Sequence, residues 1–491
     1  MPEAPLIAAP VLVPFLGAAL AMLLRERPRA SLGVALATIA VLVTSTLLLL
    51  SRVLPGTGPV PTEVFGDWPI GFGIAFSASL PGVLLVAVTT LVATAVMIYS
   101  IGDIGPRRRK AGFDALMLAM IGAVNGAFLT NDLFNLYVWF ELALLAALGL
   151  LTLDRRIAQI DGAIRYAAFA MMAATFILLG IGLVYGTAGT LDMPSIRTIL
   201  SSAEPSYSLA IAAGLLLGGL GLKSGLAPFH LWLPASYHTA PTSVVATFAG
   251  LLTKMAFYGL LFVLVGMLGL SAGARGAAHI VGILPWVAGV TMIVCAMGAL
   301  AQTDMRRILS YHVIAQVGYM AVGLALANNR GIAAAVFYMV HSIIVQTNLF
   351  LGAGLIRRAS GSWDLTRTGG MLRNNPLFAF LFAVPVLSLS GIPPFSGFWA
   401  KFIVLRESLA AGHTWMMAAG ILAGLMTIVS MALFWADACW KDARGRTRPI
   451  PASGLAAMSL LSGATVAIGL TPQPLWELAE LSARALSGNQ P

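Results

Sequence analysis

The chain has 491 residues, of which 59% are hydrophobic and only 10% are charged. A soluble protein typically carries about 25% charged residues, so the composition excludes an ordinary soluble domain. The formal net charge of +10 taken alone would suggest a nucleic-acid partner, but the basic residues cluster in short loops between long apolar segments. The composition therefore predicts an all-α integral membrane protein with many transmembrane helices.

Windows of about 20 apolar residues, the length that crosses a bilayer, predict about fourteen transmembrane helices. The predicted spans lie near residues 5–24, 31–51, 79–101, 112–129, 133–152, 162–185, 208–228, 242–267, 280–300, 305–327, 331–356, 376–411, 414–438 and 452–471. The twelfth span is long because the segment SLSGIPPFSGFW interrupts it. No basic residue precedes the first span and no clear small-residue cleavage site follows it, so we expect an uncleaved helix rather than a signal peptide.

Basic residues alternate between the two sides of the predicted membrane. The loops after spans 1, 3, 5, 9, 11 and 13 carry Arg25, Arg27, Arg29, Arg107, Arg108, Arg109, Lys110, Arg155, Arg156, Arg306, Arg307, Arg357, Arg358, Arg367, Arg373, Lys441, Arg444, Arg446 and Arg448. The opposite loops carry only Arg52, Arg197, Arg275 and Arg330. The positive-inside rule then predicts that the Arg-rich loops are cytoplasmic and that both termini lie outside. The alanine- and arginine-rich composition is typical of a high-GC bacterium, so we expect a bacterial inner membrane.

Three segments outside the spans also have a predictable character. The loops 52–78 and 186–207 are rich in Gly, Pro and Ser, and we expect neighbouring subunits to order them. The last segment, LWELAELSARALS, has an apolar stripe but is too short to cross the bilayer. It is typical of an interfacial amphipathic helix or of a helix that contacts a partner.

Four ionisable side chains interrupt the apolar helices, and they are the most informative residues of the chain. Glu141 lies in span 5, Lys223 in span 7, Lys254 in span 8 and Lys401 in span 12. A charge at mid-bilayer costs about 3 kcal/mol on insertion scales, and intramembrane ionisable residues mark ion and proton pathways. The alternatives are a structural ion pair between Glu141 and a lysine, and lysines that extend their amines to the interface.

Histidines provide further candidate proton carriers, because imidazole titrates near physiological pH. The candidates are His230 and His238 at the junction of spans 7 and 8, His312 in span 10 and His341 in span 11. A lone membrane histidine is as often a hydrogen-bonded helix contact. The sequence has no glycine-rich phosphate loop, no metal-ligand spacing and no nucleophile elbow, so we predict no cofactor, no metal site and no enzyme activity.

Spans 7 and 12 each combine Gly, Pro and a buried lysine, in GLKSGLAP and GIPPFSGFWAK. Five helices separate them, an odd offset, so the two segments run through the membrane in opposite directions. Paired Gly/Pro-interrupted helices of this kind are typical of inverted-repeat transporters. Broken helices expose carbonyls and amides, which are tolerated in the membrane only around a polar cavity.

The segments LKSGLAPFHLWLPASYHTAPTSVVATFAGLLTKMAFYGL, DMRRILSYHVIAQVGYM and LSGIPPFSGFWAKF resemble those of the proton-translocating antiporter-like subunits. That superfamily includes membrane subunits of respiratory complex I and of Mrp-type multisubunit cation/proton antiporters. The resemblance covers about residues 110–410, and NDLFNLYVWFELALLAALGLL is most similar to the D-type subunits of the Mrp antiporters.

The resemblance implies fourteen helices, with two five-helix inverted repeats and broken helices 7 and 12. The implied regions are residues 1–111 (helices 1–3), 112–267 (helices 4–8), 280–438 (helices 9–13) and 452–491 (helix 14 and the C-terminal helix). The family's functional glutamate and lysines fall on Glu141, Lys223, Lys254 and Lys401, and a helix 11 histidine falls on His341. One position departs from the pattern: related sequences often carry a lysine where this chain has Gln346.

The sequence thus predicts a proton-translocating subunit of a multisubunit monovalent cation/proton antiporter, with Na⁺ the expected cation and other membrane subunits as partners. One alternative is a proton-pumping subunit of a complex I-like or membrane-bound hydrogenase complex. A second alternative is a scaffold in which the buried charges only dock helices.

Overall fold

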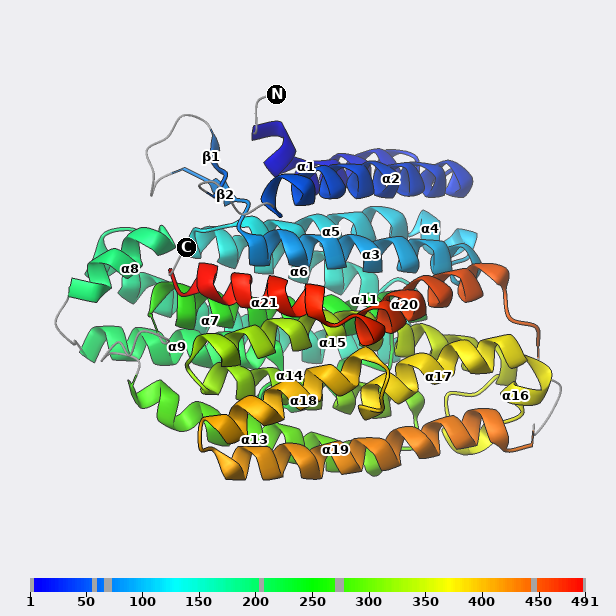
Figure 1. Cartoon of the computed structure of the whole chain (residues 1–491). Helices are drawn as coiled ribbons and strands as arrows, with labels where there is room; N and C mark the ends of the chain where they lie inside the picture. Colours follow the sequence, from blue (N-terminus) through cyan, green and yellow to red (C-terminus); the bar gives the residue numbers. More distant parts are fainter. Residues whose placement is uncertain are drawn as a thin grey trace.

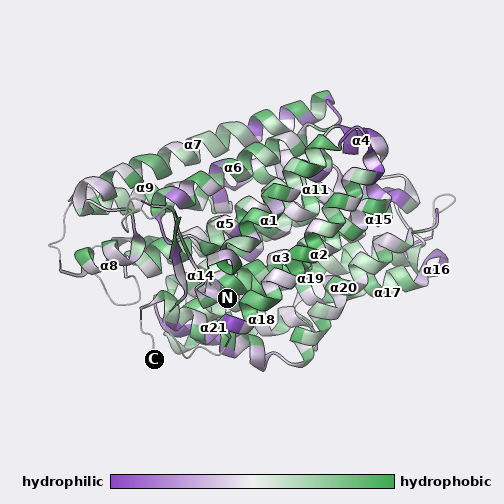
Figure 2. Cartoon of the chain, turned by 90° about the horizontal axis from the view of Figure 1, so that it is seen from above, coloured by the Kyte–Doolittle hydropathy of each residue, from purple (hydrophilic) through white to green (hydrophobic). Residues whose placement is uncertain are grey.

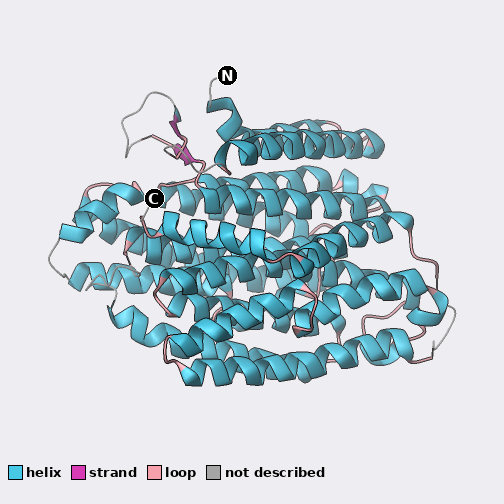
Figure 3. Cartoon of the chain, in the orientation of Figure 1, coloured by secondary structure: helices cyan, strands magenta, loops and turns pink. Residues whose placement is uncertain are grey.

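A computed structural model describes residues 4–54, 60–65, 73–202, 207–269, 278–442 and 448–488 of the chain. Nearly all of these residues are helical (Figure 3). The exception is a small antiparallel pair of strands, in which Thr62 pairs with Ser77. The strands are β1 (Thr62–Val64) and β2 (Ala75–Ser77).

The helices of the first half of the chain are α1 (Ala4–Leu23), α2 (Pro28–Val53), α3 (Leu80–Asp103), α4 (Pro106–Lys110), α5 (Phe113–Leu129), α6 (Leu133–Leu151), α7 (Ile157–Ala188), α8 (Met193–Ser202), α9 (Tyr207–Ser224), η2 (Phe229–Leu231), α10 (Trp232–Tyr237), α11 (Thr242–Thr247), η3 (Phe248–Leu252), α12 (Thr253–Leu261) and η4 (Phe262–Met267). Those of the second half are α13 (Ala278–Leu300), α14 (Met305–Ala325), α15 (Asn329–Ser360), η7 (Leu365–Arg367), α16 (Met371–Asn374), α17 (Pro376–Ser390), α18 (Ser396–Ala410), α19 (Thr414–Trp435), η8 (Ala436–Trp440), α20 (Ala452–Leu470) and α21 (Gln473–Leu486).

Within the described residues, 12 helical segments are long and apolar enough to cross a membrane. Two shorter apolar helices, α5 and α17, lie where the sequence predicts spans 4 and 12. Figure 2 shows hydrophilic residues gathered at the ends of the bundle, on α4 for example, and apolar residues along the helices. The chain is therefore a multi-pass membrane protein, as predicted, while the number of fourteen crossings stays a prediction.

Helix α15 is the centre of the bundle (Figure 1). The most apolar 18-residue stretch of this helix is entirely buried inside the chain. It packs against α14, α18, α20 and α21, and against the irregular helix formed by α11 and η3. A helix that is buried all round can carry polar side chains only where the protein itself satisfies or hydrates them.

The two predicted helix interruptions are both present. Helix α9 ends at Ser224, and Gly225 follows with φ +82°, a left-handed conformation that favours glycine. Helix α17 ends at Ser390, and Gly391 follows with φ +85° before α18 begins at Ser396. The Gly- and Pro-containing breaks predicted from the sequence are therefore confirmed.

Three predicted features outside the spans differ in detail. The predicted loop 186–207 contains helix α8, and the predicted loop 52–78 contains β1 and β2, so part of each is ordered within this chain. The C-terminal helix α21 packs its apolar face on α15 and α3. Its buried side chains, Leu475, Ala479 and Leu486, therefore contact this chain itself rather than only lipid or a partner.

The two halves of the chain share several local features. Helices α7 and α15 both have 32 residues, and each ends at a left-handed glycine, Gly189 (φ +67°) and Gly361 (φ +85°). An aspartate caps the helix before each of them: Asp132 begins α6, and Asp304 begins α14. Asp304 follows Asp132 along the chain by the same number of residues as Gly361 follows Gly189.

Each capping aspartate also forms an isolated antiparallel bridge with a second aspartate. Asp132 pairs with Asp192, and Asp304 pairs with Asp364. The first bridge precedes α8 and the second precedes α16, and these two helices lie at opposite ends of the bundle (Figure 1). Equivalent bridges at opposite ends are the arrangement that two inverted copies of one motif would produce.

A buried ion pair fastens the N-terminal helices. The guanidinium of Arg109 donates to Asp114, and the hydroxyl of Ser31 on α2 donates to the other carboxylate oxygen at 2.9 Å. Asp114 is fully buried and the Arg109 side chain is 5% exposed. The Arg109 guanidinium also donates to the carbonyl of Ser100 on α3, at 2.9 Å. One charge pair thus connects α2, α3 and α5.

Removing one member of a buried pair leaves an uncompensated charge, which typically costs about 3–5 kcal/mol. We therefore expect Asp114→Ala to lower the thermal unfolding temperature of the detergent-purified protein by several degrees. The control is Glu26→Ala, which breaks an exposed pair with Lys110 (3.3 Å) on the same side of the protein. We expect no measurable shift there, and equal shifts in the two variants would contradict the argument.

Candidate ion-translocation site

The first element of the site is an ion pair between α6 and α9. Asp132 caps α6 by accepting a hydrogen bond from the amide of Asn135 at 2.7 Å, and Glu141 follows along the same helix. Lys223 lies in the last turn of α9, directly before the break. Its ammonium donates to Glu141 Oε1 at 3.2 Å and lies 5.2 Å from the centre of the Phe140 ring. The structure therefore joins two of the predicted site residues directly.

A small cavity lies on the inner side of Lys223. Its volume is about 30 Å³, and its walls include Lys223, Tyr166 and Trp232. Leu252 at the end of η3 and Met255 in α12, close to Lys254 along the chain, also line it. A water molecule needs roughly 10–15 Å³ of such space, so the cavity has room for about two waters. It leads from the first lysine toward the helix that carries the second.

Lys254 is fully buried and has no carboxylate partner among the described residues. Its ammonium donates to the carbonyl of Ala249 at 2.7 Å. Ala249 belongs to η3, a π-helical turn that interrupts the span directly before Lys254. π-helical turns are wider than α-helical ones and are frequent at functional sites. The irregular turn thus supplies an acceptor for a cation that has no anion beside it.

Polar side chains of α15 lie between Lys254 and the second broken helix. Ser342 and Gln346 are four residues apart, so they share one face of α15. Both are fully buried, and neither the Ser342 hydroxyl nor the Gln346 amide has a hydrogen-bond partner within the described part of the protein. The hydroxyl of Thr253, next to Lys254, is also buried and without a protein partner there. Buried polar groups of this kind are commonly satisfied by internal water.

His341, just over one turn before Gln346, connects α15 to the break between α17 and α18. Its Nδ1 lies 2.9 Å from the Ser396 hydroxyl, which in turn lies 3.1 Å from the hydroxyl of Ser388. The charges of Lys254 and Lys401 both act on the His341 ring. His341 is therefore near both of the lysines that have no carboxylate partner within the described residues.

Lys401 lies in α18, directly after the break. Its side chain is almost fully buried, and its ammonium donates to the Ser390 carbonyl at the end of α17, at 3.1 Å. The same ammonium lies 5.6 Å from the centre of the Tyr319 ring. Like Lys254, this lysine is held by a main-chain carbonyl at an irregular point of a helix. An ammonium has three donors, so each of the two lysines has further donors available for water.

The remaining predicted histidines lie in different surroundings. His312 is buried in α14, with Nε2 2.8 Å from the Ser430 hydroxyl on α19, and it lies near enough to Lys401 to feel its charge. His230 is buried in η2, within the first break. His238 lies at the Arg-rich end, where its Nδ1 is 3.0 Å from the Pro234 carbonyl. Burial, reinforced by Arg307, lowers the pKa of His238, so its ring is neutral at pH 7.

The structure thus pairs Glu141 with Lys223 and places residues next to Lys254 in the wall of a cavity beside Lys223. It brings His341 near both Lys254 and Lys401, and His312 near Lys401. It also adds groups that no pattern in the sequence marks. These are the Ala249 and Ser390 carbonyls, the hydroxyls of Ser388, Ser396 and Ser430, and the ring of Tyr319. No group of three or more His, Cys, Asp or Glu that would hold a metal ion occurs in the described ranges.

The chain matches a known family of membrane proteins. Residues 130–427 match the family described as "NADH:quinone oxidoreductase/Mrp antiporter, TM". The chain belongs to this family.

Two relatives of known name are components of antiporters. The chain is 32% identical to the D-type subunit of the Na(+)/H(+) antiporter of Alkalihalophilus pseudofirmus, over 89% of this chain and 87% of that protein. It is 28% identical to the protein of the same name from Bacillus subtilis, over 92% of each chain.

Solved structures share the whole fold. A chain in the structure of the Mrp complex from Dietzia sp. DQ12-45-1b superposes with a TM-score of 0.91 and 27% identity, over 99% of this chain and 98% of that one. A chain of respiratory complex I from Thermus thermophilus superposes with a TM-score of 0.78 and 25% identity, over 96% and 99%. The family resemblance seen in the sequence is therefore confirmed, and the chain is similar over its full length to a component of an Mrp complex.

The hydrogen bonds of Ser396 generate a testable prediction. Ser396→Ala would leave the His341 Nδ1 and the Ser388 hydroxyl without this partner, and an unsatisfied buried polar group costs about 1–3 kcal/mol. We expect a lower unfolding temperature in detergent. The control is Ser408→Ala on the same helix, where the buried hydroxyl donates only to the Val404 carbonyl of its own helix (2.8 Å). A larger loss of stability in the control would contradict the assigned role of Ser396.

Proposed function

We propose that this chain is the D-type, proton-translocating subunit of a multisubunit Na⁺/H⁺ antiporter in a bacterial cell membrane. The observation that carries the proposal is the row of titratable groups from the Glu141–Lys223 pair, which is partly exposed, to the buried Lys254, His341 and Lys401. The names of its relatives and the superposition on the Mrp complex support the same function. A transporter subunit of this kind moves ions and catalyses no chemical reaction.

The proposed route follows the order of the groups in the bundle. Protons reach the Glu141–Lys223 pair, cross the small cavity to Lys254, pass the polar side chains of α15 and reach His341 and Lys401. Na⁺ moves in the opposite direction, coupled through the assembled complex. The ion pair sets when a proton is released, because a carboxylate beside an ammonium favours the charged form of each.

Gln346 takes part in this route without carrying a charge. Its amide has both donors and acceptors, and none of them has a partner within the described residues. An amide in this position can hold waters in line between Lys254 and His341 but cannot itself accept and keep a proton at neutral pH. The step past Gln346 therefore depends on water rather than on a lysine.

Other membrane subunits are the proposed partners, and the surroundings of Glu141 indicate one place of contact. The Glu141 side chain is 28% exposed at the surface of α6, between exposed apolar residues such as Phe134 and Leu145. A carboxylate facing hydrocarbon is costly. Coverage of this face of α6 by another membrane subunit would remove that cost.

We also propose the predicted topology. Residues 112–267 and 280–438 form two inverted repeats, between the N-terminal helices (1–111) and the C-terminal ones (452–491), and both chain termini lie outside the cytoplasm. The corresponding aspartate bridges at opposite ends of the bundle support the inversion. The concentration of arginines at one end supports the orientation.

Replacing Glu141 tests the function. In inverted membrane vesicles that contain the assembled complex, we expect Glu141→Gln to reduce Na⁺-dependent proton movement at least about tenfold, the scale of losing a positioned proton-transfer group. The matched control is Asp161→Asn, which removes the charge of an exposed carboxylate paired with Arg165 on α7. The control is expected to retain normal transport.

The other functions predict different outcomes of the same experiment. A scaffold would lose assembly of the complex, seen on native gels, while transport per assembled complex stayed normal. An electron-driven pump would move protons on addition of a redox substrate rather than Na⁺. Normal Na⁺-dependent transport by assembled Glu141→Gln complexes would remove Glu141 from the mechanism.

Gln346 provides a second test within α15. We expect Gln346→Leu to slow transport by about tenfold or more, because the apolar side chain cannot hold waters in line. Thr347→Val is the control, since the Thr347 hydroxyl is already bonded to the Ile343 carbonyl of its own helix at 2.8 Å. Both residues are fully buried on the same helix, so equal effects on transport would indicate a packing effect and contradict the role of Gln346.

A further inference from the structure

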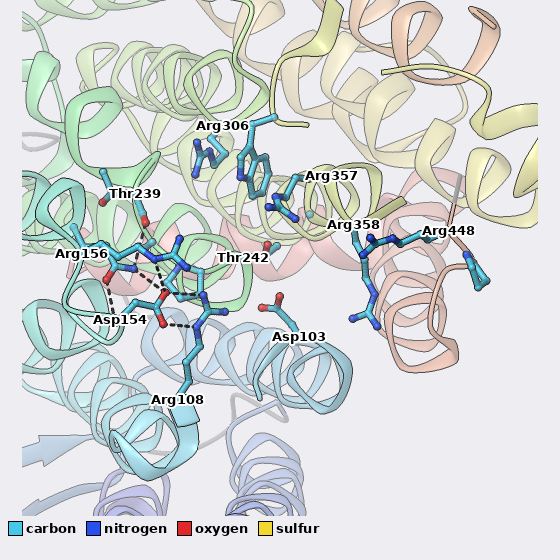
Figure 4. Close-up of a pocket in the computed structure, with 16 residues that line it drawn as sticks. Asp103, Arg108, Asp154, Arg156, Thr239, Thr242, Arg306, Arg357, Arg358 and Arg448 are labelled. Carbon is cyan, nitrogen blue, oxygen red and sulfur yellow. Dashed lines mark hydrogen bonds and ion pairs between the residues drawn. The ribbon is translucent and has the colours of Figure 1, made fainter. Parts of the chain in front are cut away.

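The Arg-rich end of the bundle contains a cavity of about 550 Å³ that is separate from the buried row (Figure 4). The ends of α3 and α15, the loop between α6 and α7, the start of α11 and the start of α14 form its walls. None of the residues of the buried row lines it. The cavity has the size of a small-molecule site, about 300–1,000 Å³.

The lining of this cavity is strongly positive. It includes six arginines, Arg108, Arg156, Arg306, Arg357, Arg358 and Arg448, against two aspartates, an excess of four positive charges. Figure 4 shows these arginines approaching the cavity from different segments of the chain. A site of this charge is adapted to an anion with more than one negative charge.

Both aspartates already have partners. Asp154 accepts two hydrogen bonds from Arg108, at 2.8 and 2.7 Å, and this contact lowers the pKa of Asp154, so the carboxylate stays charged at neutral pH. Asp103 accepts hydrogen bonds from the amide and the hydroxyl of Ser243, at 3.1 and 2.7 Å. The two carboxylates therefore do not neutralise the arginines on the opposite side of the cavity.

That opposite side is built around Trp363. The guanidinium of Arg306 lies 4.2 Å from the centre of the Trp363 ring, and that of Arg357 lies 5.9 Å from it. Arg306 also pairs with Asp304 at 3.1 Å. Among the described residues, Arg357 and Arg448 have no carboxylate within ion-pair distance. Arg306 and Arg357 thus bring two positive charges to the Trp363 ring, and of these two only Arg306 has a carboxylate partner among the described residues. This side of the cavity can therefore accept an anion.

We propose that this cavity binds a phosphate-bearing anion. A guanidinium presents its donors as a planar fork that matches phosphate oxygens, and arginine is the preferred residue for such contacts. A chloride ion would fill only a small part of the cavity, and it would balance only one of the four excess positive charges of the lining. The inference is independent of the proposed transport function, because it concerns a different set of residues.

A phosphate group can come from two sources. It can be free in solution, or it can be the headgroup of an anionic phospholipid, since basic pockets between transmembrane helices bind such headgroups. The chemistry of recognition is the same, so the experiment has one arm for each source.

The experiment uses the full chain purified in detergent. Binding of inorganic phosphate and pyrophosphate is measured by equilibrium dialysis, and retention of cardiolipin against phosphatidylcholine is measured by native mass spectrometry. We expect at least one phosphate-bearing probe to bind, and Arg357→Gln/Arg448→Gln to weaken its binding at least about tenfold, through two lost charge-assisted contacts. Binding of the soluble probes identifies a free anion, and selective retention of cardiolipin identifies a headgroup.

The control is Arg107→Gln/Arg373→Gln, which removes two exposed arginines from the same end of the protein without touching the cavity. It is expected to bind as the unmodified protein does. Arg357→Lys/Arg448→Lys keeps the charge but removes the planar forks, and an intermediate affinity is expected. If no probe bound, the proposal would be overturned. That outcome would include a cavity whose occupant is an acidic segment of another protein. So would equal weakening in the cavity variant and the control.

Discussion

The candidate site depends on how the protein stabilises buried ammonium groups that have no carboxylate partner among the described residues. Lys254 and Lys401 are both buried in the bundle, and both donate to a main-chain carbonyl, of Ala249 and Ser390 respectively. A carbonyl within a regular helix is already occupied by the amide four residues on. The two carbonyls that accept from these lysines instead lie at irregular points of the backbone, the π-helical turn η3 and the last residue of α17. Each of these two buried lysines therefore lies beside an irregular stretch of backbone that accepts from its ammonium.

Irregular backbone inside a membrane protein has to be enclosed by the protein itself, and α15 provides that enclosure. It packs on η3 on one side and on α17 and α18 on the other. Gly397, at the start of α18, lies so close to the Ser388 carbonyl that a Cβ atom would collide with it. The same close packing brings the hydroxyls of Ser388 and Ser396 to His341. Helix α15 covers the break between α17 and α18. The same helix thus also carries the polar side chains that connect this second break to the first one.

The features that were predictable from the sequence are those that a local signal marks. Gly and Pro marked both breaks, and isolated charges marked Glu141 and the three lysines. The π-helical turn before Lys254 was not predictable, because FAGLL contains no residue that distinguishes it from an α-helix. The partners of the histidines were also inaccessible, since 55 residues separate His341 from Ser396 and 118 separate His312 from Ser430. Only tertiary packing brings these groups together.

The positive charges of the row are not equally compensated by negative ones. Lys223 has Glu141 beside it, whereas Lys254 and Lys401, whose charges both act on His341, have no carboxylate partner in the part of the chain that the structure describes. Two unit charges about 10 Å apart interact by about 2 kcal/mol at an effective dielectric constant of about 20, several times the thermal energy. On the proposed route, a proton that arrives at Lys254 would therefore disfavour a second positive charge at His341 or Lys401. Since the Glu141 carboxylate stabilises positive charge at Lys223, a change in the charge of Glu141 alters the electrostatic balance along the row. On the proposed route, the Glu141–Lys223 pair is therefore the point at which a neighbouring protein of the complex would influence the flow of protons.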